Sequence, residues 1–176
     1  MANARHAGRP FCYTWTEENF EKALAVASCH LGIDSFNSDQ KKALKSFFRD
    51  SQDVYYSAPT GHGKSIVFQA MPVIADELSG LLNGASKLLV VTPLKSLMED
   101  QVKNLREKTA VTAAAIFEGQ EASVLREIEE GVHSIIYVSP ESVLSNSKWR
   151  KMLTSRLFGD YCVGVVIDEA HCIKQW

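Results

Sequence analysis

Two short segments carry the residue types that could do chemistry. The first, APTGHGKS at residues 58–65, lies between an apolar run and a helical pattern. Gly61 and Gly63 let backbone N–H groups turn toward a bound anion, and the positive end of the next helix dipole adds to the attraction. Lys64 could reach the β and γ phosphates of a nucleotide, and Ser65 could offer its hydroxyl to Mg²⁺. The segment therefore predicts a loop that binds a polyphosphate; the alternative is a glycine-rich turn with a solvated lysine.

The second segment is VVIDEAH at residues 165–171, which follows a buried strand pattern. That strand would deliver Asp168 and Glu169 to the carboxyl edge of a sheet, where the phosphate loop must also lie. We expect Asp168 to bind Mg²⁺ through water and Glu169 to position or deprotonate an attacking water. His171 would be a polar contact that couples chemistry to motion. The alternatives are a solvated acidic turn for the pair and a merely hydrogen-bonded side chain for the histidine.

The fold must bring these two segments together. From residue 54 onward, short apolar runs alternate with helical patterns. The strands are expected at Val54–Ser57, Leu88–Thr92, Val111–Ile116, Ile135–Ser139 and Val163–Ile167, and the helices at Lys64–Leu78, Lys95–Lys108, Gln120–Glu130 and Ser147–Phe158. Strands that are apolar on both faces and separated by helices require a parallel sheet that is covered on two sides. The sequence thus predicts a doubly wound, mostly parallel α/β sheet with helices on both faces, and Pro72 is expected to kink or end its helix.

Two helices are expected before this sheet. A capping box of Thr14 and Glu17 would open the first, which would end at Leu31 and Gly32. The second would run from about Ser38 to Phe48.

Composition sets the limits on class and partners. The chain has 176 residues, the length of one domain, and its 45% of hydrophobic residues can form a sizeable core. Its 19 basic and 21 acidic residues give a net charge of −2, which neither supports nor excludes a nucleic acid partner. The four cysteines form no C-x-x-C pair, so reduced thiols in an intracellular protein are expected. No apolar stretch approaches the ~18 residues of a membrane span, so no membrane partner is expected.

Several segments resemble the motifs of a known family. APTGHGKS together with DEAH resembles motifs I and II of superfamily 2 helicases, which have RecA-like P-loop NTPase domains. VVTPLKSLMEDQV at 90–102 resembles motif Ia of the RecQ-like DNA helicases, and YVSPE at 137–141 resembles their following segment. HCIKQW at 171–176 resembles the opening of their aromatic-rich loop, and LGIDSFNSDQKKAL at 31–44 resembles their motif 0.

The resemblance implies a site for ATP and Mg²⁺. Gln40 would read the adenine edge, with Phe36 in the matching place of motif 0. The phosphate loop would hold the nucleotide through Thr60, Gly61, His62, Gly63, Lys64 and Ser65. Ser65 and Asp168 would hold Mg²⁺, and Lys64, Asp168 and Glu169 would drive hydrolysis.

The resemblance also implies a partner, single-stranded or partly duplex DNA. Thr92, Pro93 and Ser96 would lie against the single-strand backbone, and Ser139 and Glu141 would flank the same track. Trp176 in the aromatic-rich loop would also contact nucleic acid, and His171 would communicate between the two sites. The plainer interpretation of residues 92–105 is a helix that begins at a proline and is capped by Thr92, with a buried apolar stripe; both can hold together.

The predicted organisation is an N-terminal segment with a helix at 1–30 and the first RecA-like, ATP-binding domain at 31–176. The second RecA-like domain of such helicases is missing from the chain, so we expect these residues alone to bind ATP, hydrolyse it slowly and not unwind DNA. An intracellular location is expected, nuclear in a eukaryote.

The chain also departs from the family pattern. Leu31 stands where an aromatic residue is usual, Asn37 where an arginine is usual, His62 in place of a glycine and Lys174 in place of a serine. The first two departures remove groups that could stack on adenine.

Other functions remain open at this point. A DNA helicase with 3′–5′ polarity is the first hypothesis. The others are a nucleotide-responsive nucleic-acid-binding module, a catalytically dead fragment, and a motor of another branch, such as an RNA helicase or a restriction enzyme.

Overall fold

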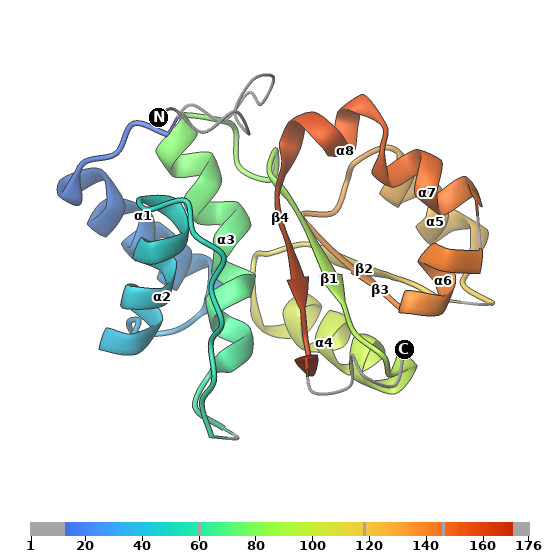
Figure 1. Ribbon diagram of the computed structural model, residues 1–176, viewed down its shortest axis with the longest axis horizontal. Coiled ribbons are helices and arrows are strands. Elements are labelled where there is room, and N and C mark those ends of the chain that lie inside the picture. The colour runs from blue at the N-terminus through green and yellow to red at the C-terminus, as the bar shows by residue number, and fades with distance from the viewer. Residues whose placement is uncertain (1–12, 60, 118, 146, 171–176) are drawn as a thin grey trace.

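The computed structural model describes residues 13–59, 61–117, 119–145 and 147–170. Three helices come first, and strands and helices alternate after them (Figure 1). The elements are α1 (Glu17–Leu31), α2 (Ser38–Phe48), α3 (Lys64–Ser79), β1 (Lys87–Val91), α4 (Lys95–Lys108), β2 (Ala113–Ile116), α5 (Ala122–Glu129), β3 (Ile135–Val138), α6 (Pro140–Ser145), α7 (Ser147–Leu153), α8 (Arg156–Tyr161) and β4 (Cys162–Ile167).

The strands of the described residues form one parallel sheet in the order β2-β3-β1-β4. Val91 at the end of β1 lies in register with Val138 of β3 and with Ile167 of β4. The carboxyl ends of these three strands therefore meet at one edge of the sheet, which is where ligands bind in open α/β sheets.

Helices cover the sheet on both faces (Figure 1). One apolar core joins α1, α2, α3 and α4 to the sheet and includes Phe20, Ile74 and Met98. The core on the opposite face joins α5, α7 and α8 to the sheet and includes Ile128, Trp149 and Phe158. This arrangement confirms the predicted doubly wound α/β sheet with helices on both faces and N-terminal helices before it.

The segment Val54–Ser57 is not a strand, so this part of the prediction is wrong. Its residues have no regular secondary structure, and Tyr55 is 85% exposed. A strand needs a neighbour that supplies backbone partners. Within the described residues, β4 pairs with β1 and no ladder joins β4 to residues 54–57.

Most of the helices lie where the local sequence signals predict them. The predicted bounds of α2 and α4 are confirmed. The first helix is capped by Thr16 instead of Thr14: its Oγ1 accepts the N–H of Asn19 at 3.0 Å. Pro72 does not end α3, which continues to Ser79. The helix expected at 147–158 is divided into α7 and α8.

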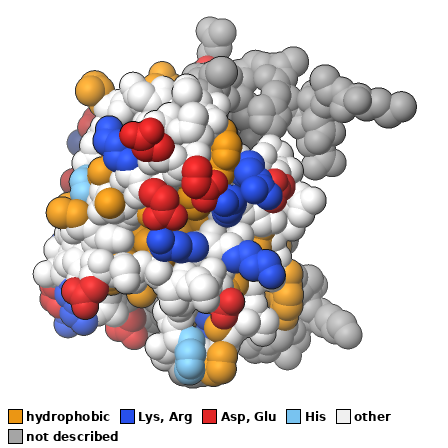
Figure 2. Space-filling view, turned by 90° about the vertical axis from the view of Figure 1, so that its left-hand side faces the viewer, with side chains coloured by type: hydrophobic (Ala, Val, Ile, Leu, Met, Phe, Trp, Pro, Cys, Tyr) orange, Lys and Arg blue, Asp and Glu red, His pale blue; other side chains and the backbone are white. Residues whose placement is uncertain are grey.

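The N-terminal helix α1 packs on α3 within the same core, although the proposed domain boundary at residue 30 lies at its end. Ion pairs also connect α1 to α2, between Lys41 and Glu21 at 2.9 Å and between Lys45 and Glu17 at 2.6 Å. Figure 2 shows acidic and basic side chains interleaved on this face. The division at residue 30 stays a prediction.

Two of the four cysteines, Cys29 and Cys162, lie in described residues, and no disulfide joins them there. Among the described residues, no helix combines the length and the apolar character needed to cross a membrane.

Candidate nucleotide and nucleic-acid site

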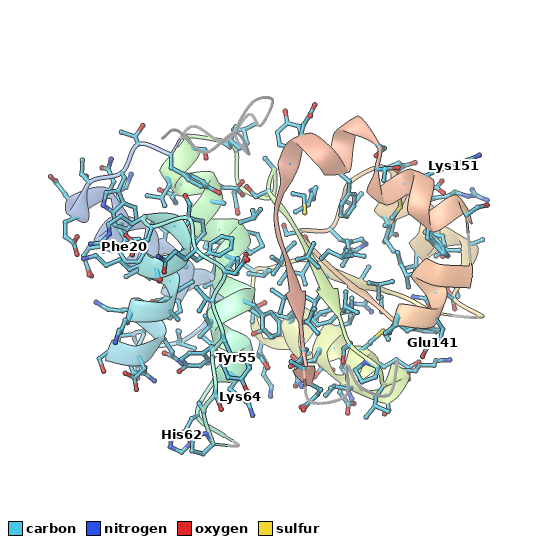
Figure 3. The ribbon with its side chains drawn as sticks, in the orientation of Figure 1. Phe20, Tyr55, His62, Lys64, Glu141 and Lys151 are labelled. Atoms are coloured by element: carbon cyan, nitrogen blue, oxygen red, sulfur yellow. The ribbon has the colours of Figure 1, made fainter. Side chains whose placement is uncertain are left out.

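The phosphate loop lies at the end of the molecule where β4 finishes (Figure 1). Figure 3 shows His62 and Lys64 at this end, with Tyr55 nearby on the segment that leads into the loop. Lys64 is the first residue of α3. The structure thus places the loop and the carboxyl ends of the strands on the same side, as the two motifs require.

The N-terminus of α3 is suited to an anion. Gly63 precedes the helix, and among the described residues no side chain caps the helix there. The first turn also holds no acidic residue. The first N–H groups of a helix lack intrahelical partners and carry the positive end of the dipole, so an uncapped start favours a phosphate.

Gly61 and Gly63 both have left-handed backbone, with φ of 84° and 70°. A Cβ atom at Gly63 would lie 2.7 Å from the Nε2 atom of Gln40, whereas one at Gly61 would meet nothing within 4 Å. The positive φ favours glycine at both positions, and at Gly63 a methyl group would in addition displace the Gln40 amide.

Gln40 joins the start of α2 to the phosphate loop. Its Oε1 accepts the N–H of Asn37 at 2.9 Å, and its Nε2 donates to the carbonyl of Gly63 at 3.2 Å. Asn37 returns the first bond by accepting the N–H of Gln40, which completes a capping box. Gln40 is 5% exposed, so in this arrangement its amide supports the loop and shows little surface for a base.

The other residues of the motif 0 segment are buried or structural. Phe36 and Leu31 are both buried in the core that joins α1, α2 and α3 to the sheet. Neither faces solvent in the way that a base-stacking side chain would. The predicted role of Phe36 in nucleotide binding stays untested.

The acidic pair follows β4 directly. The N–H of Asp168 donates to the carbonyl of Val91 at 2.9 Å, which extends the β1–β4 pairing by one residue. Glu169 has left-handed backbone with φ of 51°, and its N–H donates to Asp168 Oδ1 at 3.0 Å. A non-glycine residue in this region is uncommon and is often found at functional sites.

Burial raises the pKa of Asp168 above its ordinary value, and the charge of Glu169 adds to the rise. The N–H of Glu169 and the positive charge of Lys64 act in the opposite direction. Lys64 and Asp168 are therefore within electrostatic reach of each other, although 104 positions separate them in the sequence. A partly buried carboxylate that lacks full compensation favours a bound cation.

The residues present fit a nucleotide with Mg²⁺. Ser65 and Asp168 supply the oxygen ligands that Mg²⁺ prefers, while the described residues contain no cluster of three or more His, Cys, Asp or Glu that could hold a metal without phosphate ligands. Beside Asp168, the Oγ1 of Thr92 is buried and has no hydrogen-bond partner among the described residues. Thr92 is also fully buried, so its side chain does not face the predicted nucleic acid track in this arrangement.

A cavity of about 420 Å³ adjoins the phosphate loop. Its walls come from α2, from the segment 54–59 and from His62; they include Asn37, Asp39, Lys42 and Tyr55. It is the space next to the loop in which a base and sugar could lie, and His62, one of the departures from the family pattern, forms part of its wall.

The predicted nucleic-acid residues lie where β1 and β3 end. Thr92 donates its N–H to the carbonyl of Val138, which brings it beside Ser139. Ser96 and Glu141 are exposed, and Pro93 and Ser139 are half-buried. The hydroxyl of Ser139 accepts the N–H of Ser142 at 3.2 Å and so has a structural role at the start of α6. Thr60, His171 and Trp176 lie outside the described residues.

One polar group near this edge was not predicted from the sequence. Gln69 of α3 donates to Gln101 of α4 at 2.9 Å, and Tyr137 of β3 is fully buried near Gln69. Burial, with a smaller contribution from the charge of Asp168, raises the pKa of Tyr137. The sequence signal that could have indicated this contact is a glutamine in each of two amphipathic helices, Gln69 and Gln101. These contacts connect the helix of the phosphate loop to the helix that follows the nucleic-acid motif.

Comparison with known proteins agrees with this geometry. The family model for DEAD/DEAH box helicases matches residues 37–176. Similar curated proteins include the "Bifunctional 3'-5' exonuclease/ATP-dependent helicase WRN" of Mus musculus, 31% identical over 88% of this chain and 10% of its own length. They also include the "ATP-dependent DNA helicase Q-like 5" of Arabidopsis thaliana, 34% identical over 92% of the chain and 16% of its length.

A bacterial relative is the "ATP-dependent DNA helicase RecQ" of Haemophilus influenzae, which is 33% identical over 88% of the chain and 23% of its own length. The chain thus spans less than a quarter of the length of each of these three relatives. The resemblance to RecQ-like DNA helicases is confirmed by these matches. With a phosphate loop, an acidic pair at the neighbouring strand end and a family match that covers both, the chain belongs to the DEAD/DEAH box helicase family.

Proposed function

We propose that this chain is the ATP-binding domain of an ATP-dependent 3′–5′ DNA helicase of the RecQ type. The observation that carries the proposal is the uncapped N-terminus of α3, whose first residue, Lys64, lies within electrostatic reach of the half-buried Asp168. The helix start favours an anion, and the carboxylate favours a cation. Mg²⁺-ATP supplies both.

Each residue of the site has a role in this proposal. The N–H groups after Gly61 and Gly63 and the ammonium of Lys64 hold the phosphates, and Ser65 and Asp168 hold Mg²⁺. Bound ATP supplies the phosphoryl bond whose hydrolysis releases energy. Glu169 orients a water and accepts its proton at the carboxylate. Gln40 keeps the loop in register with α2 through its bond to Gly63.

The nucleic acid would lie along the start of α4. Pro93 and Ser96 stand at this helix start, and Ser139 ends the neighbouring strand. Loops and helix starts at strand ends present N–H and hydroxyl groups to phosphates without reading bases. The names of the Arabidopsis thaliana and Haemophilus influenzae relatives describe DNA helicases, which supports DNA as the partner.

Fluorescence anisotropy with a labelled single-stranded DNA, and with an RNA of the same sequence, tests this partner. We predict that the chain binds the DNA, that rising salt weakens binding, and that Ser96→Glu weakens it by about tenfold, because a negative charge then faces the phosphates. Ser123→Glu, an exposed serine on α5, is the matched control and should bind as wild type does.

Stronger binding to the RNA would favour a helicase of another branch over the proposed one. Equal binding by the Ser96→Glu and Ser123→Glu variants would show that the start of α4 does not contact the strand.

A further inference from the structure

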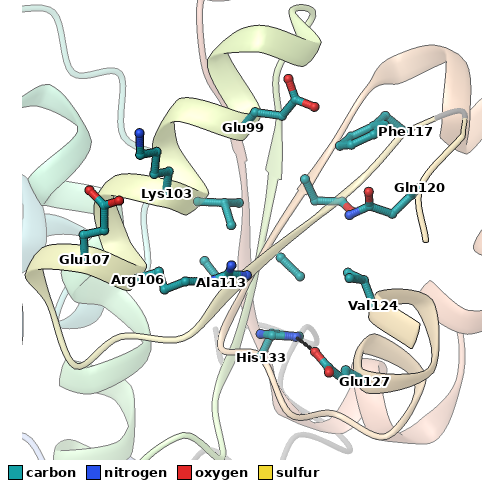
Figure 4. Close-up of a pocket in the computed structure, with 13 residues that line it drawn as sticks. Glu99, Lys103, Arg106, Glu107, Ala113, Phe117, Gln120, Val124, Glu127 and His133 are labelled. Carbon is teal, nitrogen blue, oxygen red and sulfur yellow. Dashed lines mark hydrogen bonds and ion pairs between the residues drawn. The ribbon is translucent and has the colours of Figure 1, made fainter. Parts of the chain in front are cut away.

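A groove lies along β2, at the opposite edge of the sheet from the strand that leads to Asp168. It has a volume of about 430 Å³. Figure 4 shows α4 on one side, with Glu99, Lys103, Arg106 and Glu107, and the region of α5 on the other, with Gln120, Val124 and Glu127. Ala113, Ala114 and Ala115 of β2 form its base. None of these residues takes part in the proposed nucleotide or DNA sites.

The backbone of β2 has one open side within the described residues. β2 pairs with β3 alone, with Ala113 beside Ile135 and Ile116 beside Val138. The carbonyl of Thr112 accepts the N–H groups of Ser134 and Ile135, so it points toward β3. Because residues of a parallel strand direct their backbone groups alternately to either neighbour, those of Ala113 and Ala115 point into the groove.

One of these groups already has a partner. The Nε2 of Gln120 donates to the carbonyl of Ala115 at 3.1 Å, which closes the carboxyl end of this edge. The N–H and carbonyl of Ala113 point to the open side of the strand. An unpaired row of this kind is a template for another strand. The three alanines carry small side chains, so the backbone of a ligand could approach this edge closely.

The charges of the groove select the occupant. On the α4 wall, Glu99 is paired with Lys95 at 3.9 Å. Lys103 and Arg106 are exposed and have no ion-pair partner among the described residues. Glu107 is the one acid of this wall that also has no ion-pair partner among them. On the other wall Glu127 is paired with His133 at 3.0 Å. The uncommitted charge on the α4 wall is therefore positive.

We propose that this groove docks an extended acidic peptide segment of a partner protein, which adds a strand to the free edge of β2. Its backbone bonds to Ala113 and Ala115, its carboxylates face Lys103 and Arg106, and alternate small apolar side chains face Val124. About four residues match the length of β2. A nucleic acid fits less well, because it has no row of backbone amides to pair with the strand.

The probe is a labelled octapeptide of alternating Asp and Val, titrated with the 176-residue chain while ¹⁵N amide shifts are followed by NMR. Two matched peptides serve as controls: one with N-methylated amides, which has no backbone donors, and one with Lys in place of Asp. We expect the Asp/Val peptide to bind with a Kd of roughly 10–100 µM and to shift the amides of Ala113 and Ala115. Both control peptides should bind at least about tenfold more weakly.

Variants on the surface of α4 keep the test independent of folding. The double variant Lys103→Glu/Arg106→Glu should lower the affinity at least about tenfold, because the peptide carboxylates then face acids. Arg126→Glu, a charge reversal on the exposed face of α5, should bind as wild type does.

Equal binding of the N-methylated peptide would overturn strand addition. Equal binding by the double variant would overturn the acidic preference. Competition at these amides by single-stranded DNA in place of the peptide would also contradict the proposal. All of these readouts are separate from ATP binding, so they do not depend on the proposed helicase function.

Discussion

At the scale of single residues, Asn37 shows why a departure from a family pattern can be structural. The resemblance implies an arginine at this position, and the structure places Asn37 at the N-cap of α2, where its side chain accepts the N–H of Gln40 at 2.9 Å. Asn37 also lines the cavity beside the phosphate loop. Helix capping and base stacking thus compete for this one position.

We therefore predict opposite effects for Asn37→Arg. The free energy of unfolding should fall by about 1 kcal/mol, because the cap is lost. The affinity for ATP should rise, because a guanidinium plane can stack on adenine. Urea unfolding and nucleotide titration measure the two effects. Asn104→Arg on the exposed face of α4 is the control and should change neither. An unchanged unfolding free energy in Asn37→Arg would contradict the capping role.

Gly63 and Gly61 offer a matched pair. Alanine at either position is strained by the positive φ, at about 1–2 kcal/mol. Only Gly63→Ala also places a methyl group against Gln40. We predict that urea unfolding shows a larger loss for Gly63→Ala than for Gly61→Ala. In a Gln40→Ala background the difference between the two losses should shrink, since only the contact with Ile66 Cδ1 at 3.1 Å remains; an unchanged difference would refute the contact with Gln40.

At the scale of elements, two buried charged residues, Lys87 and Asp76, hold the loop between α3 and β1 through backbone groups. The Nζ of Lys87 donates to the carbonyls of Gly84 and Gly131, at 2.7 and 2.6 Å, and Asp76 accepts the N–H groups of Gly84 and Ser86. Burial lowers the pKa of Lys87 and raises the pKa of Asp76. These two residues thus connect the end of α3 to the starts of β1 and β3. Removing their charges from water costs free energy of folding.

The shifted pKa of Lys87 predicts a pH dependence. Between its lowered folded pKa and its ordinary value of 10.5, the unfolded chain holds more protons than the folded one, so stability rises with pH. Lys87→Met leaves two carbonyls unpaired and should lose about 1–3 kcal/mol at neutral pH. Urea unfolding at pH 7, 8.5 and 10 should show the gap between wild type and variant widening with pH. A constant gap would contradict the shift.

Much of the fold could be predicted from local sequence signals, and the errors of that prediction have physical causes. The predicted bounds of α2 and α4 agree with the structure: α2 begins at the capping box of Asn37 and Gln40, and α4 begins two residues after Pro93. The cap predicted at Thr92 is wrong, because the N-cap residue of α4 is Leu94, whose side chain cannot accept a hydrogen bond. The segment Val54–Ser57 was predicted as a strand from its composition, but strand formation depends on a neighbour that no local pattern reveals. The extent of α3 beyond Pro72 likewise depends on its burial between α1 and the sheet.

For the candidate site, the sequence predicted the main residues but not the hydrogen bonds that hold them in place. The loop at 58–65 and the pair Asp168 and Glu169 were found from motif spacing, and the packing of α3 on the sheet explains how they approach each other. The links that hold the site could not be read from spacing, because they join residues distant in sequence. Gln40 to Gly63 and Gln69 to Gln101 are two examples.

At the scale of the whole molecule, the two edges of one sheet have different chemistry. The end of β4 carries the acidic pair, and the open side of β2 at the far edge carries backbone groups and uncommitted cations. The polar contacts among α3, α4 and β3 lie between them. A single α/β sheet can therefore offer one site for a nucleotide and a separate surface for a partner.

The central claim is that the start of α3 binds Mg²⁺-ATP together with Asp168. Isothermal titration calorimetry of the 176-residue chain with ATP tests it most directly. We predict one site that requires Mg²⁺ and that Lys64→Ala weakens at least about tenfold, or ~1.4 kcal/mol, without a change in thermal unfolding. Lys151→Ala, an exposed lysine on α7 at the far side of the molecule from the phosphate loop (Figure 3), should bind nearly as wild type does. No heat of binding at high protein concentration, or equal binding by Lys64→Ala, would contradict the account.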